Sequence, residues 1–320
     1  MATQLRIGVV LLRERENHCL FFGPMGLRHE AASAYLDEHG LDLALGDRLP
    51  PWSDYSDVKV AAAYCHGAPH RCGSFVGLFA HADQIRICAS VEELVDSCDA
   101  VMLINTGGEG EANRSLVETS LKAGKPIYVD KFLAPRLRDA LAMVEMAEAR
   151  GVLIDSASLL LTAPRTLALL EKVKERRVDR VVVHGKFGES LAFSIHLIAH
   201  LQLGAGCRRV ETVRGEGPSK SLTVTVEFDG GPVGRIDPSS EPDIALDLQL
   251  GTQVFRSLCP VDDYRGGADT MMRRFFDSLT GKRRFTSPGQ VMIDALVIWE
   301  GAQRSLVAGR ALMRDEIIRA

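Results

Sequence analysis

The first half of the chain alternates short apolar runs with segments of helical spacing. Buried strands are predicted at Ile7–Leu12, Val58–Tyr64, Asp99–Thr106 and Lys125–Asp130. Val152–Ser156 is either one more strand of the same sheet or a link to the next domain. Helices are predicted at Leu27–Glu38, Ser90–Cys98, Glu111–Ala123 and Pro135–Arg150. Strands that alternate with helices predict a parallel sheet covered on both faces, in which ligands bind at the carboxyl ends of the strands.

Local signals mark the ends of several of these helices. Ser90 followed three residues later by Glu93 is the capping-box pattern of a helix start. Gly124 and Gly151 each follow a helical segment, at the place where glycine commonly ends a helix.

The pattern changes after Ser156. Strand candidates now follow one another, at Val178–Lys186, Arg208–Arg214, Ser221–Phe228, Val233–Ile236 and Asp243–Leu250. Asp229-Gly230-Gly231 is a hairpin signal. Consecutive strands of this kind predict a largely antiparallel sheet. Two helices, Ala268–Leu279 and Pro288–Ala308, are expected to finish the chain.

Composition narrows the class of protein. With 320 residues, 46% hydrophobic and 25% charged, the chain is typical of a globular protein with two domains. A net charge of −4 gives no general attraction to nucleic acid or to an anionic membrane, so neither is an expected partner. No apolar run approaches the roughly 20 residues that span a bilayer. The N-terminus lacks a secretory pattern, and the seven scattered cysteines favour reduced thiols, so a cytoplasmic location is expected.

Several stretches occur in a recognisable order. Leu121–Lys131 reads LKAGKPIYVDK, Glu189–Gly204 has the place of a substrate-facing helix, and Thr270–Phe276 and Ser287–Ser305 form a carboxy-terminal pair. In this order the chain resembles the Gfo/Idh/MocA family of oxidoreductases, whose corresponding segment is AGKxxxxEKP. The resemblance covers most of the chain.

The resemblance implies both a fold and an activity. The expected fold is α/β, with a Rossmann-type parallel sheet in residues 1–131. A C-terminal α+β domain with a mostly antiparallel open sheet follows in residues 132–320, and its final helices are candidates to pack back on the first domain. The implied activity is hydride exchange between NAD or NADP and a small polar metabolite such as a sugar or polyol. A homo-oligomer formed through the C-terminal sheet is also implied.

The dinucleotide loop departs from the family pattern. Phe21–His29 preserves two glycines of G-x-G-x-x-G, at Gly23 and Gly26, but Phe21 stands at the first glycine position. The strand Ile7–Leu12 also ends well before this loop. Gly23 and Gly26 are therefore candidate phosphate contacts in a lengthened loop. The alternative is that they only make a turn and cap a helix.

Two further cofactor contacts are altered. No acidic residue follows Val58–Tyr64, and His66 stands near the place of the expected ribose carboxylate. An alternative second strand, Leu41–Asp47, does end in an aspartate, and the sequence leaves both open. The loop that begins Asn105-Thr106-Gly107 replaces the family's TPxxxH loop. These three residues are expected beside the nicotinamide, with a simple turn as the alternative.

The resemblance also supplies candidate catalytic residues. Lys131 matches the lysine of EKP, with Asp130 in place of the glutamate, and is expected to reach both the cofactor and the substrate oxygen. The alternative is a surface lysine at a strand end. His196 matches the histidine that accepts the alcohol proton, although Ala192 and Ala199 stand where the family has aspartates. His200 shares its helical face and is a substitute partner, unless both are ordinary interface histidines.

One stretch lies outside the resemblance. Two thiols and two imidazoles fall within eight residues, at Cys65, His66, His70 and Cys72, which is a conceivable zinc set. Their spacing lacks the usual pair-of-pairs pattern, so we expect a strand-end loop and no metal.

Together, the missing glycine, ribose carboxylate and helix aspartate also support a rival hypothesis: a degenerate family member that binds a metabolite or partner without redox turnover.

Overall fold

The computed structural model describes residues 4–12, 25–28, 30–31, 55–67, 72–104, 113–188, 190–241, 243–259, 262–282 and 288–320. The chain divides into two units. The first comprises Met1–Leu133, Ala142–Ser156 and Met272–Phe285. The second comprises Ala134–Leu141, Ala157–Met271 and Thr286–Ala320. Each unit contains one sheet, so the division follows the change of pattern seen in the sequence.

The first unit is built on six parallel strands in the order β3-β2-β1-β4-β5-β6. Their bounds are Leu5–Leu11 (β1), Val58–Cys65 (β2), Arg86–Ile87 (β3), Ala100–Ile104 (β4), Ile127–Asp130 (β5) and Ile154–Ala157 (β6). All five residues of β4 are buried, as expected of a strand covered on both faces. The predicted Rossmann-like parallel sheet is thus confirmed.

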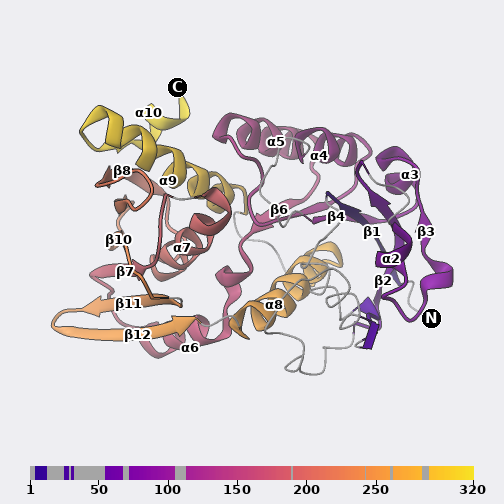
Figure 1. Cartoon of the computed structure of the whole chain (residues 1–320), viewed down its shortest axis with the longest axis horizontal. Helices are drawn as coiled ribbons and strands as arrows, with labels where there is room; N and C mark the ends of the chain where they lie inside the picture. The colour runs from indigo at the N-terminus through magenta and orange to yellow at the C-terminus, as the bar shows by residue number, and fades with distance from the viewer. Residues whose placement is uncertain are drawn as a thin grey trace. The chain divides into compact units, whose positions relative to one another are not determined.

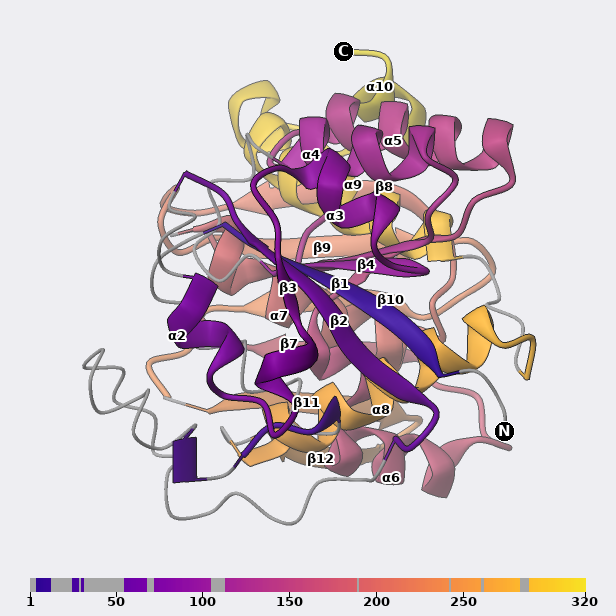
Figure 2. The ribbon, with the colours of Figure 1, turned by 90° about the vertical axis from the view of Figure 1, so that its right-hand side faces the viewer.

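Helices cover both faces of this sheet. Their bounds are Cys72–Val76 (α2), Val91–Asp96 (α3), Asn113–Lys122 (α4) and Leu137–Arg150 (α5). Figure 2 shows α3, α4 and α5 on one side and α2 on the other. The chain runs outward from β1 to the edge strand β3 and then returns to the other side of β1 as β4. Because the crossovers are right-handed, the connecting helices change from one face of the sheet to the other at this point.

The start of α3 follows the predicted cap with one difference. The Ser90 side chain accepts a hydrogen bond from the backbone of Glu93, at 3.2 Å. The Glu93 carboxylate reaches back one residue further than a capping box requires, accepting from the backbone N–H of Ala89 at 2.7 Å.

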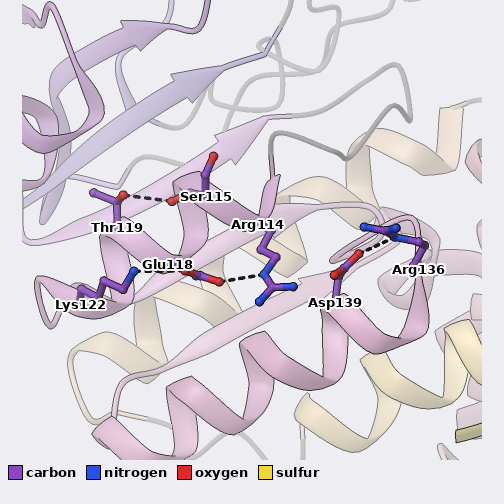
Figure 3. Close-up of polar contacts among 7 residues, drawn as sticks. All are labelled: Arg114, Ser115, Glu118, Thr119, Lys122, Arg136 and Asp139. Carbon is purple, nitrogen blue, oxygen red and sulfur yellow. Dashed lines mark hydrogen bonds and ion pairs between the residues drawn. The ribbon is translucent and has the colours of Figure 1, made fainter. Parts of the chain in front are cut away.

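The outer face of α4 is polar (Figure 3). Glu118 accepts from Arg114 at 2.8 Å and from Lys122 at 3.1 Å, both at a spacing of four residues. These hydrogen bonds hold the pKa of Glu118 below its ordinary value. Exposed pairs of this kind add only about 0.3–0.5 kcal/mol each, so the buried side of α4 supplies most of its stabilisation.

Helix α8, Asp262–Leu279, begins earlier than predicted. The sequence predicted a helix from Ala268, whereas the helix is continuous from Asp262. Within the first unit, the ring of Phe275 packs 5.7 Å from that of Tyr128 on β5. Phe276 packs edge-on to Tyr55 at 5.6 Å. The second part of α8 therefore covers the parallel sheet beside β5.

The second unit contains seven strands in the order β12-β11-β7-β10-β9-β8-β13. Their bounds are Arg180–His184 (β7), Val210–Glu216 (β8), Thr223–Phe228 (β9), Val233–Asp237 (β10), Ile244–Leu250 (β11), Gln253–Cys259 (β12) and Leu312–Met313 (β13). Every pair is antiparallel except β7 with β10, which confirms the predicted mostly antiparallel sheet. The hairpin signal is also confirmed, since Gly230 turns with a φ of 55° between β9 and β10. Strand β12 was not predicted.

Helices cover one face of this second sheet. They are Pro164–Val173 (α6), Leu191–Gly204 (α7), Pro288–Ala308 (α9) and Arg314–Ile318 (α10), together with the short 3-10 turn Leu159–Thr162. Helix α7 packs on β7, β10 and β11, and α9 packs on β8 (Figure 1). Burial alternates along β8 and β10, so the other face of the sheet is open.

Among the described helices, none combines the length and apolar character that crossing a bilayer requires.

Candidate active site

The order of the parallel strands reverses at β1, which has β2 on one side and β4 on the other. In open α/β sheets, ligands bind outside the carboxyl ends of the strands at such a switch point. The described residues at this edge include Cys65 at the end of β2, His66 after it, Lys131 after β5, and Ser156 near the end of β6. Gly23, Asn105, Thr106 and Gly107 lie outside the described residues.

Lys131 has an unusual backbone conformation. Its φ is 61°, and among the described non-glycine residues only Cys207 shares a positive φ. The residue is 7% exposed, and its carbonyl accepts a hydrogen bond from the Ser156 hydroxyl at 3.0 Å. A left-handed conformation costs a lysine roughly 1 kcal/mol or more, and such residues persist where the surrounding structure holds them. Strain and burial together mark Lys131 as a functional candidate.

Strands β5 and β6 carry two buried acidic residues. Asp130 ends β5 and Asp155 lies on β6, and both are almost fully buried. Burial raises the pKa of Asp155 to about 7, although the nearby charge of Arg274 opposes the shift. The Oδ2 atom of Asp155 has no hydrogen-bond partner. Burial, followed by the charges of Asp130 and Asp155, holds the pKa of Tyr128 well above its ordinary value.

The edge after β2 is polar without being acidic. His66 is exposed, and its Nδ1 lies 3.4 Å from the Tyr64 hydroxyl. The described residues that follow β2, His66 and Gly67, include no carboxylate that would bind a ribose in the usual way. An imidazole and a hydroxyl can still donate to or accept from ribose hydroxyls.

Gly26 lies elsewhere in the first unit than expected. Its carbonyl accepts from the backbone of Ala80 at 2.8 Å, and it borders a cavity of about 280 Å³ shared with Gln4, Val58 and Lys59. Those three residues are at the amino ends of β1 and β2, opposite the edge where phosphate is expected. A φ of 94° explains the glycine as a turn residue, so we leave Gly26 out of the site proposed below.

In the second unit, His196 lies on the buried helix α7. Its Nδ1 is 2.7 Å from the Ser158 hydroxyl, which also accepts from the backbone of Leu160 at 3.2 Å. A serine hydroxyl can donate to one tautomer of this imidazole or accept from the other. The Ser158 hydroxyl therefore fixes the orientation of the His196 ring.

His200 lies one turn further along α7 and is fully buried. Its Nδ1 is 3.1 Å from the carbonyl of His196, so Nδ1 carries the proton in the neutral ring. Burial lowers the pKa of His200 to about 4, and its Nε2 has no hydrogen-bond partner. His200 is thus a neutral imidazole at pH 7, bonded to the backbone of His196.

Sequence reasoning missed three polar residues near these candidates: Asp155, Ser156 and Ser158. All three fall at or just after a buried strand, which is where polar residues often serve a site. That signal was present, but nothing in the local sequence indicated which backbone or side chain each would contact.

Within the described ranges, no group of three or more His, Cys, Asp or Glu side chains is arranged to hold a metal ion. His70, one member of the conceivable zinc set, lies outside those ranges.

Comparisons with known proteins bear on the fold. No family model matches the sequence, and no curated protein matches it. Solved structures do match, over nearly the whole chain. GenD2 from gentamicin A biosynthesis, in complex with NAD, is 15% identical with a TM-score of 0.72, covering 98% of this chain and 97% of that one. A probable dehydrogenase from Thermotoga maritima is 16% identical with a TM-score of 0.72, covering 98% and 100%.

A third match is an oxidoreductase from Agrobacterium radiobacter in complex with NAD+, L-tartaric acid and magnesium. It is 16% identical with a TM-score of 0.69, covering 98% of this chain and 100% of that one. At these identities the likeness establishes the fold, a Rossmann-like parallel sheet joined to a mostly antiparallel one, and leaves the chemistry to be argued from the residues.

Proposed function

We propose that this protein is an NAD(P)-dependent oxidoreductase of Gfo/Idh/MocA type that acts on a hydroxyl or carbonyl group of a small polar metabolite such as a sugar or polyol. The observation that carries the proposal is Lys131: a buried lysine with a left-handed backbone at the carboxyl end of β5. Two of the matching folds were solved with NAD or NAD+ bound, which supports the proposal.

The proposed task of Lys131 is electrostatic. During oxidation of an alcohol, negative charge develops on the substrate oxygen, and an ammonium group held near that oxygen stabilises it. The Ser156 hydroxyl, bonded to the Lys131 carbonyl, fixes the backbone from which the side chain extends. A preorganised charge needs no rearrangement during the reaction, which is a reason to maintain a strained conformation here.

The proposed task of His196 is proton exchange. An imidazole ordinarily titrates near neutral pH and suits general acid–base work. Ser158 holds Nδ1 at 2.7 Å, and this contact fixes the ring orientation in which the imidazole would exchange the alcohol proton. His200 is proposed to support the helix position of His196 and not to titrate at neutral pH, because burial keeps its pKa at about 4.

The described residues account for part of a nicotinamide dinucleotide site. A nicotinamide dinucleotide, when bound, supplies the carbon that accepts or donates the hydride. The switch point beside β1 and β4 is where such a group binds in this architecture. Lys131, Asp130 and His66 are the described residues proposed to line its site. The missing carboxylate after β2 leaves the ribose to be bound by other groups.

That missing carboxylate also favours a second candidate function. In it, the chain binds a metabolite or partner without redox turnover. The two candidates differ in whether nicotinamide is reduced. A panel of sugars and polyols, incubated with the protein and NAD+ or NADP+, is followed by the absorbance of reduced nicotinamide. Turnover that Lys131→Ala abolishes supports the enzyme, whereas tight metabolite binding without reduction of either nucleotide supports the second candidate.

A homo-oligomer formed through the open face of the second sheet is part of the proposal. Apolar side chains on this face are unusually exposed, with Val254 at 61% and Leu258 at 50% on β12. Charged residues lie between them, since Asp247 on β11 accepts two hydrogen bonds from Arg256 on β12, at 2.6 and 2.7 Å. Apolar groups among paired charges are typical of protein interfaces.

A further inference from the structure

Two cysteine thiols lie together at the carboxyl end of β2 and have no part in the proposed hydride chemistry. Cys65 is the last residue of β2, and Cys72 is the first residue of α2. Their Sγ atoms are 2.6 Å apart, and neither belongs to a disulfide bond. Both residues are buried, at 4% and 0% exposure.

The separation of the sulfur atoms distinguishes two uses of a thiol pair. Two thiolates on one tetrahedral zinc ion each lie roughly 2.3 Å from the metal, and therefore about 3.8 Å from each other. The Cys65–Cys72 separation of 2.6 Å is far shorter than this. It is within about 0.6 Å of a covalent sulfur–sulfur bond. The geometry favours a direct bond between the sulfurs over a shared metal ion.

The thiols of the first unit differ in how readily they ionise. The hydrogen bond with Cys65 lowers the pKa of Cys72. Burial raises the pKa of Cys88, and it raises that of Cys98 to about 11. Because the thiolate is the form that reacts with oxidants, Cys72 is favoured over both of these neighbours.

We propose that Cys65 and Cys72 form an intramolecular disulfide when the protein meets a peroxide. The Cys72 thiolate attacks one peroxide oxygen, the O–O bond breaks, and a sulfenic acid and hydroxide form; the hydroxide takes a proton and becomes water. The Cys65 sulfur then attacks the Cys72 sulfur, the S–O bond breaks, and a second water leaves. Two thiols lose two electrons and two protons in total, and hydrogen peroxide is reduced to two waters.

The chain offers a direct readout of this bond. Trypsin cleaves after Lys59, Arg71 and Arg86, so Cys65 and Cys72 fall on separate peptides, 60–71 and 72–86. The full-length protein is reduced, freed of reductant and treated with equimolar hydrogen peroxide. Remaining thiols are then blocked with iodoacetamide, and the digest is analysed by mass spectrometry.

The expected result is one linked species, peptides 60–71 and 72–86 joined with the loss of two hydrogens, which dithiothreitol separates. Cys88→Ser should form the same link, while Cys72→Ser should not. Recovery of both peptides with alkylated cysteines after peroxide overturns the proposal, as does a link from either cysteine to a third one. A stoichiometric zinc ion that blocks the link, seen by native mass spectrometry, overturns it as well. None of these outcomes depends on nicotinamide binding.

Discussion

Lys131 has a backbone conformation that a glycine would adopt without strain. Lys131→Gly should therefore be more stable than Lys131→Ala, by about 1 kcal/mol in the free energy of unfolding, because alanine retains the strain. Both variants should lose at least about a hundredfold in turnover, since both lack the ammonium group. Urea unfolding and steady-state kinetics on the two variants check this.

The pair of variants separates two claims about Lys131. Equal stability of the glycine and alanine variants would show that the conformation is not strained. Wild-type turnover by either variant would show that the amine has no role in the reaction.

Ser158 is the residue that orients His196, at 2.7 Å from Nδ1. Ser158→Ala should reduce kcat by about tenfold with little change in KM, and should shift the pH profile of kcat, because the imidazole loses control of its tautomer. The matched control is Ser278→Ala, whose hydroxyl donates to a carbonyl within α8 at 2.9 Å. An unchanged pH profile in Ser158→Ala would mean that the hydrogen bond is only structural.

At the scale of elements, α7 carries a buried group that links stability to pH. The pKa of His200 is lowered to about 4 in the folded protein, below its unfolded value of about 6.5. The unfolded chain therefore takes up a proton first, and stability falls as the pH drops from about 6.5 to 4, by an amount on the order of 3 kcal/mol. His200→Leu should remove this loss, as measured by denaturant unfolding at pH 7 and 4.5.

Strand β6 carries a buried group whose contribution to stability changes with pH in the opposite direction. The pKa of Asp155 is raised by burial to about 7, above its unfolded value of about 3.9. Its contribution to stability is fully present below pH 4 and is lost as the pH rises toward 7. Asp155→Asn should therefore make the first unit more stable at pH 7 and little changed at pH 4. A variant that is destabilised equally at both pH values would contradict the assigned pKa.

The sequence predicted most elements because apolar periodicity is a local property of the chain. It placed the start of α8 too late, at Ala268, directly after the helix-disfavouring pair Gly266 and Gly267. In the structure these glycines permit close packing: a Cβ on Gly267 would lie 2.2 Å from the Leu159 carbonyl oxygen, and one on Gly266 would lie 2.5 Å from Pro164. The sequence alone does not distinguish a glycine that makes room for a distant segment from a glycine that makes a turn.

The candidate site shows the same contrast between what local sequence indicates and what distant segments determine. The resemblance selected Lys131 and His196 as candidates, and their roles remain predictions. It gave no sign of the hydrogen bond between Ser158 and His196, whose residues are separated by 38 positions. It also gave no sign that Asp155 would be buried with an oxygen that lacks a partner. Partners of this kind are set by tertiary packing, which a single sequence does not encode locally.

At the scale of the whole molecule, the units are discontinuous in sequence. The first unit takes in 142–156 and 272–285 in addition to its N-terminal segment. A single boundary at residue 131 places five strands of the first sheet before it and strand β6, Ile154–Ala157, after it. It does not describe these later segments, because their apolar faces fit either sheet when only the sequence is known.

The open face of the second sheet makes a prediction for the assembly. Val254→Asp combined with Leu258→Asp should lower the molecular mass in solution, because buried carboxylates without partners oppose association. Light scattering after size-exclusion chromatography measures the mass. Exposed Val307→Asp on α9 is the matched control and should leave the mass unchanged. A wild-type protein that is already monomeric would contradict the proposed oligomer.

Nucleotide binding tests the central claim most directly, because every proposed role of Lys131 requires a nicotinamide beside the carboxyl edge of the parallel sheet. Purified protein is titrated with NADH and with NADPH by isothermal calorimetry, alongside Lys131→Ala. The proposal predicts a Kd in the micromolar range for at least one nucleotide, weakened in the variant. Absence of heat for both nucleotides at millimolar concentration would contradict it.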